Sequence, residues 1–419
     1  MSSVLIIADD LSGAADCASA YARAGRETLV VIDREASGAH GAADVVAIDA
    51  DSRRMPAADA ASLHRALHAR HAALGQLLYK KIDSTLRGNF AAEIAAIADA
   101  AGMAIVAPAF PAAGRTTCEG RQYINGVALE QSEVWRAEGI DGVADIPAML
   151  ARQGLRTGRL TLADVRHDSA SLAARIKQAA ADGVQALVCD IECDDDLHAI
   201  AQASAQLTAR CYWVGSAGLA VHLAQVERGS ALPSPQLAVA GAILTVVGSL
   251  SSVSRAQAQR LRDATGMAGI DVAASLLRQG APAASVADLR RTLASTLGQG
   301  QDLLLTIAMD ENIDMREGLQ LCQGLAALVA PLAGTIGALV STGGETARAM
   351  LCAMHYSGLR LVGEVEPGVP LSIAAGPRAL PVITKAGAFG HRDTLLHCHA
   401  TLAQLRGAAP AMTHPTKGS

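Results

Sequence analysis

The chain has 419 residues, of which 51% are hydrophobic but only 2% aromatic, and its formal net charge is −5. It is too long for one ordinary core, so we expect two domains, and a core of Ala, Leu, Val and Ile suits helices packed on a parallel sheet. The sequence has no run of basic residues, which disfavours nucleic-acid binding, although a few local cations could still bind a small anion.

The N-terminal segment and the cysteines are typical of a cytoplasmic protein. Residues 1–3 lead directly into the aliphatic run 4–7, so no signal peptide is predicted, and we expect no run of about 18 apolar residues that could cross a membrane. Eight scattered cysteines without a CxxC pair indicate free thiols in a reducing cytosol rather than a zinc site. We therefore expect a soluble, cytoplasmic protein without a membrane partner.

In the first half of the chain, short apolar runs alternate with helical patterns. Strands are predicted at 4–7, 29–32, 45–48, 77–79, 104–107 and 186–190. Helices are predicted at about 14–24, 57–74, 90–97 and 194–210. An Asn-Gly pair at 125–126 predicts a hairpin turn. The alternation is typical of βαβ units, which form a mostly parallel sheet.

Polar side chains closely follow four of these strands. They are Asp9 with Asp10, Asp51 with Arg53, the segment Lys81–Arg87, and the segment Arg115–Thr117. Because the carboxyl ends of parallel strands share one edge of a sheet, these groups could converge on a single crevice. Converging Arg and Lys indicate a carboxylate or phosphate, whereas the aspartates suit sugar-like hydroxyls, a metal ion or general-base work. Singly, each group has an ordinary explanation as a capping or surface residue.

The stretch Lys80–Asn89 is the most informative of these turns. It reads KKIDSTLRGN and joins a predicted strand to a predicted helix. Helix capping accounts for one hydroxyl or carboxylate, but not for Lys81, Asp83 and Arg87 together. We interpret the stretch as part of a site that binds a small anion and handles a proton.

A stretch rich in Ser and Pro separates the two halves of the chain. We place an N-terminal domain at 1–226, a linker at 227–241 and a C-terminal domain at 242–419. Strands of the second half are predicted at 242–247, 303–306, 338–340 and 382–385. Helices are predicted there at about 255–264 and 321–332.

Three of the later strands run into turns rich in Gly, Ser or Thr, at 248–254, 341–347 and 386–390. Bare N–H groups at helix N-termini attract phosphate, although neither a P-loop nor a GxGxxG fingerprint is present. Charged strand ends in the first half thus suit an anionic substrate, and these turns suit a polyphosphate. We predict an α/β protein of two domains, each a mostly parallel sheet flanked by helices, with an active-site cleft between them, as in a small-molecule kinase.

Seven motifs occur in order along the chain. They are IADDLSGAAD (7–16), KKIDSTLRGN (80–89), PAFPAAGRTT (108–117), GSLS (248–251), TGGETA (342–347), EPGVP (366–370) and KAGAFG (385–390). Together they resemble the four-carbon acid sugar kinases over essentially the whole chain. Ser12 stands where Thr is commoner, which keeps the hydroxyl, and the stretch between Ser251 and Gly343 carries no recognised motif.

The resemblance implies an N-terminal acid-sugar domain, a C-terminal ATP domain, and ATP-dependent phosphorylation of a terminal hydroxyl. The expected substrate is D-threonate, giving 4-phospho-D-threonate, with D-erythronate or a 3-oxo-tetronate as alternatives. The intact motif at 81–87 is more similar to the threonate and erythronate branch than to the oxo-acid branch.

From this resemblance we also assign expected roles to residues. The residues expected to bind the substrate are Asp9, Asp10, Arg53, Lys81, Ile82, Asp83, Ser84, Arg87 and Arg115. Of these, the cations at 53, 81 and 87 would hold the substrate carboxylate, and Asp83, or alternatively Asp10, would orient and deprotonate the terminal hydroxyl. The residues expected to bind ATP are Ser249, Ser251, Gly343, Gly344, Glu345, Thr346 and Gly387. Mg²⁺ would bridge the ATP phosphates.

A function of a different class fits some of these features. A non-catalytic sensor that closes on a sugar acid would share the composition and the charged strand ends, although it needs no polyphosphate cradle. An acid-sugar dehydrogenase is disfavoured because the dinucleotide fingerprint is missing. The stereochemistry of the substrate and the formation of a homo-oligomer stay open at this point.

Overall fold

The structure is a computed structural model, and it describes residues 3–34, 43–73, 76–205, 207, 210–226, 237–249, 251–308, 317–387 and 389–407. The chain divides into two compact units, Met1–Leu232 and Pro233–Ser419. Most of the linker predicted at 227–241 lies outside the described residues.

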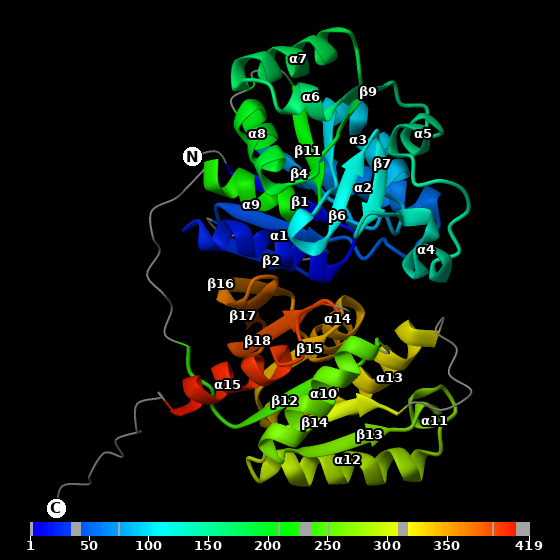
Figure 1. Ribbon diagram of the computed structural model, residues 1–419. Helices are drawn as coiled ribbons and strands as arrows, with labels where there is room; N and C mark the ends of the chain where they lie inside the picture. The colour runs from blue at the N-terminus through cyan, green and yellow to red at the C-terminus, as the bar shows by residue number, and fades with distance from the viewer. Residues whose placement is uncertain are drawn as a thin grey trace, which may run out of the picture. The chain divides into compact units, whose positions relative to one another are not determined.

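The N-terminal unit is built on a parallel sheet (Figure 1). Its strands lie in the order β2 (Thr28–Val31), β3 (Val45–Asp49), β1 (Val4–Ala8), β4 (Leu77–Lys81), β11 (Cys211–Gly215), β5 (Met103–Ala107), β10 (Ala186–Cys189) and β9 (Thr157–Leu160). All of these neighbouring strands pair in parallel. The strands are short and aliphatic, as expected for strands covered on both faces.

Helices pack on this sheet in two groups. One group contains α1 (Leu11–Arg23), α6 (Leu162–Val165), α7 (Ser169–Ala181), α8 (Asp194–Ala205) and α9 (Ala217–Val226). The other contains α2 (Ala57–His71), α3 (Phe90–Ala101) and α5 (Ile146–Ala151). In α3, the side chains of Phe90, Ile94 and Ile97 join the hydrophobic core because their spacing places them on one face of the helix.

A small antiparallel sheet forms in the excursion after β5. It contains β6 (Arg115–Cys118), β7 (Arg121–Ile124) and β8 (Val127–Ala128), and the short helix α4 (Glu133–Ala137) follows. Asn125 and Gly126 both have positive φ, 49° and 77°, and Ile124 pairs with Val127 across them. This two-residue turn with both φ angles positive confirms the hairpin predicted from the Asn-Gly pair.

The C-terminal unit contains a second, mixed sheet. Its strands lie in the order β13 (Ala268–Val272), β14 (Leu303–Ile307), β12 (Ala242–Val247), β15 (Ile336–Thr342), β18 (Leu380–Lys385), β17 (Val369–Ala375) and β16 (Gly358–Glu366). The strands from β13 to β18 are parallel, whereas β17 and β16 continue the sheet in antiparallel fashion. The predicted α/β class with two mostly parallel sheets is confirmed.

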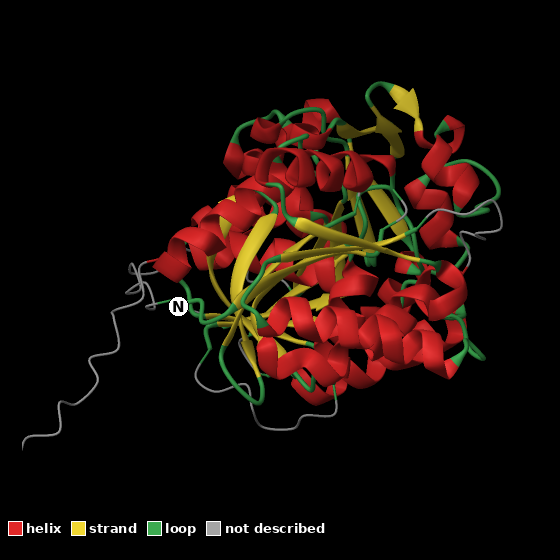
Figure 2. Cartoon of the chain, turned by 90° about the horizontal axis from the view of Figure 1, so that it is seen from below, coloured by secondary structure: helices red, strands yellow, loops and turns green. Residues whose placement is uncertain are grey.

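The helices of this unit also form two groups, and Figure 2 shows strands running between layers of helices. One group contains α10 (Ser252–Thr265) and α15 (Thr394–Gly407). The other contains α11 (Ala274–Leu277), α12 (Ala283–Gly298), α13 (Gly318–Val329) and α14 (Gly344–Ala353). Leu395, Cys398 and Leu402 of α15 pack with Ile243 and Val247 of β12 in the core.

One stretch differs from the expectation that no segment could cross a membrane. Among the described residues, Gly318–Thr335 reaches the length of a spanning helix with a mean hydropathy of 1.2. It consists of α13 and the 3-10 helix η4 (Ala330–Thr335), which has a proline in its first turn. Because Leu321, Leu325 and Leu328 are buried in the C-terminal unit, we interpret the stretch as a core helix of a folded domain.

Candidate active site

The three turns that carry most of the predicted acid-sugar residues leave neighbouring strands. β1 lies between β3 and β4, and Ala8 is in register with both Asp49 and Lys81. The chain passes from β1 to β2 and β3 on one side, but from β4 to β5 on the other side. The strand order therefore reverses between β1 and β4, and ligands of open α/β sheets bind outside the carboxyl ends of strands at such a point.

Arg53 holds the two aspartates that follow β1. Its Nε and Nη2 donate to Asp9 at 2.7 and 3.1 Å, and its Nη1 and Nη2 donate to Asp10 at 3.0 and 2.8 Å. These bonds commit most of the N–H groups of the guanidinium. The sequence predicts Arg53 as a clamp for the substrate carboxylate, whereas in the structure its fork is occupied by two carboxylates of the protein itself.

Asp83 is an ionised carboxylate in the turn after β4. Its Oδ1 accepts hydrogen bonds from the backbone N–H and the hydroxyl of Thr85 at 2.8 and 2.9 Å, and its Oδ2 accepts one from Arg87 Nε. Burial alone raises the pKa of Asp83, but Arg87, Arg53 and Lys81 outweigh burial and hold the pKa well below its usual range. A carboxylate with so low a pKa is a weak base, so it is better suited to orienting a hydroxyl than to removing its proton.

Lys81 is a buried cation that is available to a ligand. Its side chain is 6% exposed, and among the described residues no hydrogen bond or ion pair holds its ammonium group. A Cβ added at Gly13 would lie 2.6 Å from Lys81 Nζ, so the missing side chain makes room for the ammonium beside the first turn of α1. Burial lowers the pKa of Lys81, but Cys17, Asp9 and Asp10 raise it above its usual value. A charged ammonium in this position can bind a carboxylate.

The residue before Lys81 belongs to a buried ion pair. Lys80 Nζ lies 2.9 Å from Glu93 Oε2, and both side chains are fully buried. The other oxygen of Glu93 accepts a hydrogen bond from the Ser52 hydroxyl at 2.6 Å. His64 Nδ1 lies 3.7 Å from the same carboxylate, and burial lowers the pKa of His64 to about 4, so it is neutral at pH 7. The pair thus joins β4, α3 and the turn that presents Arg53.

The other predicted residues of this unit occupy different surroundings. Arg115 begins β6 and is partly buried, and burial lowers its pKa although the nearby Asp83 raises it. The Ser84 carbonyl accepts a hydrogen bond from Gln122 Nε2 at 2.8 Å, which ties the turn to the small sheet. Ile82 is 1% exposed and packs in the hydrophobic core, so only its backbone could contact a ligand.

In the C-terminal unit, the three turns rich in Gly and Ser lie against one another. A Cβ added at Gly387 would lie 2.5 Å from Ser249 Oγ, and a Cβ added at Gly343 would lie 3.8 Å from Ser249 Cβ. Ser254 donates a hydrogen bond to the Gly387 carbonyl, and the Ser251 N–H donates one to Ser249 Oγ at 3.2 Å. Gly387 therefore lets its turn lie directly against Ser249, because a side chain there would collide with the serine hydroxyl. Backbone N–H groups in turns of this kind can bind a phosphate.

Two helices begin at these turns without a side-chain cap. Ser251 precedes α10 and Gly343 precedes α14, and neither position supplies a side-chain hydrogen bond to the first turn of its helix. By contrast, Asp10 caps α1 by accepting a hydrogen bond from the Gly13 N–H at 3.0 Å. Helix starts without a side-chain cap can bind an anion through their first backbone N–H groups, so the starts of α10 and α14 are candidate phosphate sites.

Lys385 and Thr346 occupy surroundings that the sequence did not predict for the ATP site. Lys385, to which the sequence analysis gives no role, donates to the carbonyls of Ala386 and Gly387 at 2.9 and 3.2 Å. Burial lowers the pKa of Lys385 to about 8. Thr346 is buried, and its hydroxyl lies 3.3 Å from Cys322 Sγ, so it faces the interior of the unit.

Comparison with known proteins matches both units. A family described as a sugar-binding N-terminal domain matches residues 4–223, and a family described as a nucleotide-binding C-terminal domain matches residues 244–395. The chain is 48% identical to a D-threonate kinase of Cupriavidus necator, over 96% of this chain and 98% of that protein. It is 36% identical to a D-threonate kinase of Bordetella bronchiseptica, again over 96% and 98% of the two chains.

A solved structure supports the fold. A protein of Salmonella typhimurium described as a putative tRNA synthase superposes with a TM-score of 0.82 at 21% identity. The superposition covers 96% of this chain and 100% of that chain. At this level of identity the likeness concerns the fold alone.

The buried pair Lys80–Glu93 gives a test of how the N-terminal site is supported. We expect Glu93→Gln to lower the free energy of unfolding by about 3–5 kcal/mol, because it leaves the Lys80 ammonium buried without a counter-charge. Chemical denaturation followed by circular dichroism measures this loss. The double variant Lys80→Met/Glu93→Leu removes both charges and should recover most of it.

Asp288→Asn is the matched control, because it breaks the exposed pair with Arg291. It should leave the unfolding midpoint unchanged. A midpoint of Glu93→Gln equal to that of the unchanged protein would contradict the supporting role of the pair.

Proposed function

This chain belongs to the four-carbon acid sugar kinase family, and we propose that it transfers the γ-phosphoryl group of ATP to the terminal hydroxyl of D-threonate, giving 4-phospho-D-threonate. The match of both units to the family and the two D-threonate kinases support this assignment. Lys81 carries the proposal. Its ammonium is buried, charged and without a hydrogen bond or ion pair among the described residues, and it lies near Asp9 and Asp10. This arrangement suits an anionic substrate that also offers hydroxyls.

We assign the substrate carboxylate to Lys81. Arg53 is held by Asp9 and Asp10, so it acts by fixing those carboxylates, which would accept hydrogen bonds from the substrate hydroxyls. Arg87 is partly exposed and could add to the positive field on the substrate. Ser84 and Arg115 remain proposed contacts of the substrate.

Asp83 would orient the terminal hydroxyl. Its carboxylate is ionised throughout the physiological pH range and is held by Thr85 and Arg87, so it can accept a hydrogen bond from that hydroxyl in a fixed direction. Phosphoryl transfer depends mainly on positioning and on charge neutralisation, and a strong base is not required. Asp10 is the alternative for this role and for removal of the proton.

We place ATP at the turns of the C-terminal unit that contain Ser249, Gly343 and Gly387. The starts of α10 and α14, which have no side-chain cap, and the glycine backbone at Gly343 and Gly387 suit phosphate oxygens, and Lys385 supplies a positive charge beside Gly387. Ser249 lies at the centre of these turns. Mg²⁺ would accompany ATP and neutralise phosphate charge, as in other phosphoryl transfers, and we assign it no protein ligand. An active-site cleft between the domains stays a prediction.

The alternatives concern the substrate and the class of function. D-Erythronate or a 3-oxo-tetronate could replace D-threonate, because their stereochemistry and oxidation state depend on fine placement of hydroxyl partners. A sugar-acid sensor would use the N-terminal site but would not need the proposed phosphate site at Ser249, Gly343 and Gly387. We further propose a cytoplasmic location, in keeping with the buried free thiols of Cys17, Cys189 and Cys398. A homo-oligomer stays a prediction.

A panel of sugar acids tests the proposed activity. ADP release in a coupled assay should be fastest with D-threonate, and slower with D-erythronate and with 3-oxo-tetronates. Lys81→Met should raise KM for the sugar acid by at least about tenfold, because it removes a charge-assisted contact with the carboxylate, and should leave ATP binding unchanged. Tight binding of D-threonate without any ADP release would favour the sensor.

The role of Asp83 has its own test. Asp83→Asn keeps the shape of the side chain but removes its charge, so kcat should fall by a factor of about 100 or more while the dissociation constant of ATP changes little. Steady-state kinetics and calorimetric ATP titration measure the two quantities. Near-full turnover by this variant would shift the orienting role to Asp10.

The pKa of Lys385 predicts a pH dependence of ATP binding. As pH rises through about 8, the Lys385 ammonium of the free protein loses its proton and its attraction for phosphate. The dissociation constant of ATP should therefore increase about tenfold between pH 7 and pH 9. Lys385→Met should bind ATP weakly at pH 7 and lose this slope. Lys177→Met, at an exposed position of α7, should behave like the unchanged protein; a slope that survives Lys385→Met would exclude the role.

A further inference from the structure

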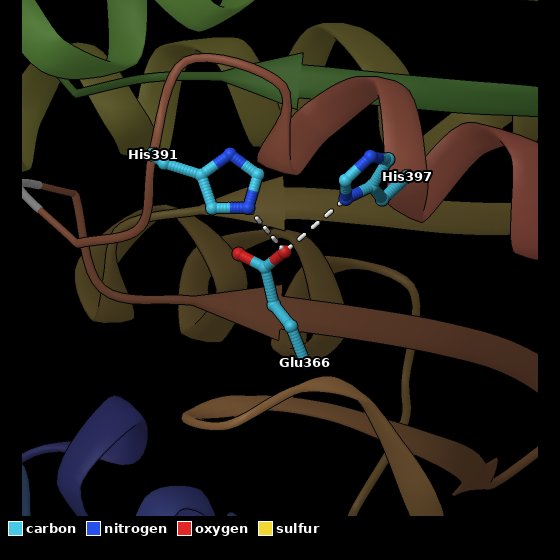
Figure 3. Close-up of side chains that lie close together, drawn as sticks. All are labelled: Glu366, His391 and His397. Atoms are coloured by element: carbon cyan, nitrogen blue, oxygen red, sulfur yellow. Dashed lines mark hydrogen bonds and ion pairs between the residues drawn. The ribbon is translucent and has the colours of Figure 1, made fainter.

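Two histidines and a glutamate of the C-terminal unit point toward one another (Figure 3). Glu366 ends β16, His391 follows the Gly387–Gly390 turn, and His397 lies in α15. His391 Nε2 is 3.1 Å from Glu366 Oε2, and His397 Nδ1 is 3.4 Å from the same oxygen. Within the described part of the chain, no other group of three such side chains gathers its ligand atoms within 4.8 Å.

These separations match the spacing of ligand atoms around a small metal ion. Ligands about 2.0–2.2 Å from a tetrahedral Zn²⁺ are about 3.3 Å from one another. The two imidazole rings are inclined by 69° with their centroids 5.3 Å apart, so they do not stack and both can direct a nitrogen toward one point. One histidine offers Nε2 and the other Nδ1, and both nitrogens bind zinc in proteins.

The Thr394 hydroxyl orients the Glu366 carboxylate for metal binding. Thr394 donates a hydrogen bond to Glu366 Oε1, which leaves Oε2 facing the two imidazoles. The same hydroxyl accepts a hydrogen bond from the His391 backbone N–H at 2.9 Å. Outer partners of this kind orient the ligands of metal sites. The Asp393 N–H donates to His391 Nδ1 at 3.2 Å, so Nε2 carries the ring proton in the absence of a metal. Metal binding at Nε2 would move that proton to Nδ1 and break this hydrogen bond.

We propose that Glu366, His391 and His397 form a binding site for a divalent transition metal ion of the Zn²⁺ class. Two imidazole nitrogens select such ions over Mg²⁺ and Ca²⁺, which prefer oxygen ligands. The histidine side chains are 58% and 53% exposed and the glutamate 15%, so an ion can enter and a fourth position stays open to water. A bound ion would link β16, the segment after β18, and the first turns of α15.

Spectroscopy and thermal unfolding of the untagged full-length chain test the site. After removal of metals with a chelator, Co²⁺ should add a visible absorption band that saturates at one equivalent and that Zn²⁺ displaces. Zn²⁺ should also raise the melting temperature in a concentration-dependent manner, because it binds the folded state, whereas Mg²⁺ should not. Neither readout depends on the kinase activity proposed above.

Variants assign the band to these side chains. His391→Gln and His397→Gln change exposed residues and should each weaken Co²⁺ binding by at least about tenfold, and Thr394→Val should weaken it through the orientation of Glu366. His167→Gln, at a histidine that is 57% exposed in the N-terminal unit, is the matched control and should bind like the unchanged protein. No band, or a band that survives both histidine changes, would overturn the proposal and leave Glu366 as a hydrogen-bond acceptor for two imidazoles.

Discussion

The buried pair between Lys80 and Glu93 is the constraint on which the N-terminal site depends. Removing one partner of a buried ion pair leaves an uncompensated charge, which costs about 3–5 kcal/mol. Glu93 also receives the Ser52 hydroxyl, and the next residue, Arg53, holds Asp9 and Asp10. The pair therefore fixes the turns after β1, β3 and β4 relative to one another before any ligand binds.

The anion sites that we propose for the two units are of different physical kinds. In the N-terminal unit, the positive charge comes from buried side chains whose surroundings include several carboxylates, so a ligand must offer both an acid group and hydroxyls. In the C-terminal unit, it comes mainly from backbone N–H groups at the uncapped starts of α10 and α14, with Lys385 beside them. Backbone groups recognise phosphate by shape and need no particular side chain. This difference suits a variable sugar acid on one unit and a constant polyphosphate on the other.

The sequence patterns predicted the fold class and the approach of the charged turns to one another, but not which charged groups pair. Apolar runs and the residues at their ends predicted the parallel strands and the turns at 9–10, 53 and 80–89. Strands β16 and β17 were missed. In β17, Pro370 argues against a central strand; the structure accommodates it as the second residue of the strand, beside a register shift between Glu364 and Glu366 of β16. The ion pairs of Arg53 with Asp9 and Asp10 could not be predicted. Sequence spacing indicates that charged side chains approach one another, but not which of them pair. Glu93, in an otherwise apolar stretch of α3, was the available signal for the buried pair.

Two adjacent lysines at the end of β4 differ in what holds them in place. Successive side chains of a strand point to opposite faces, so Lys80 reaches Glu93 of α3 while Lys81 lies beside Gly13 of α1. Lys80 is tied to the stability of the fold, and its loss is tolerable only together with that of Glu93. The ammonium of Lys81 has no hydrogen bond or ion pair among the described residues, so we expect its replacement to act mainly on ligand binding and on the pKa of the nearby Asp83. In the divergence of such sequences, position 81 is therefore open to selection for a new substrate, while positions 80 and 93 must be inherited as a pair.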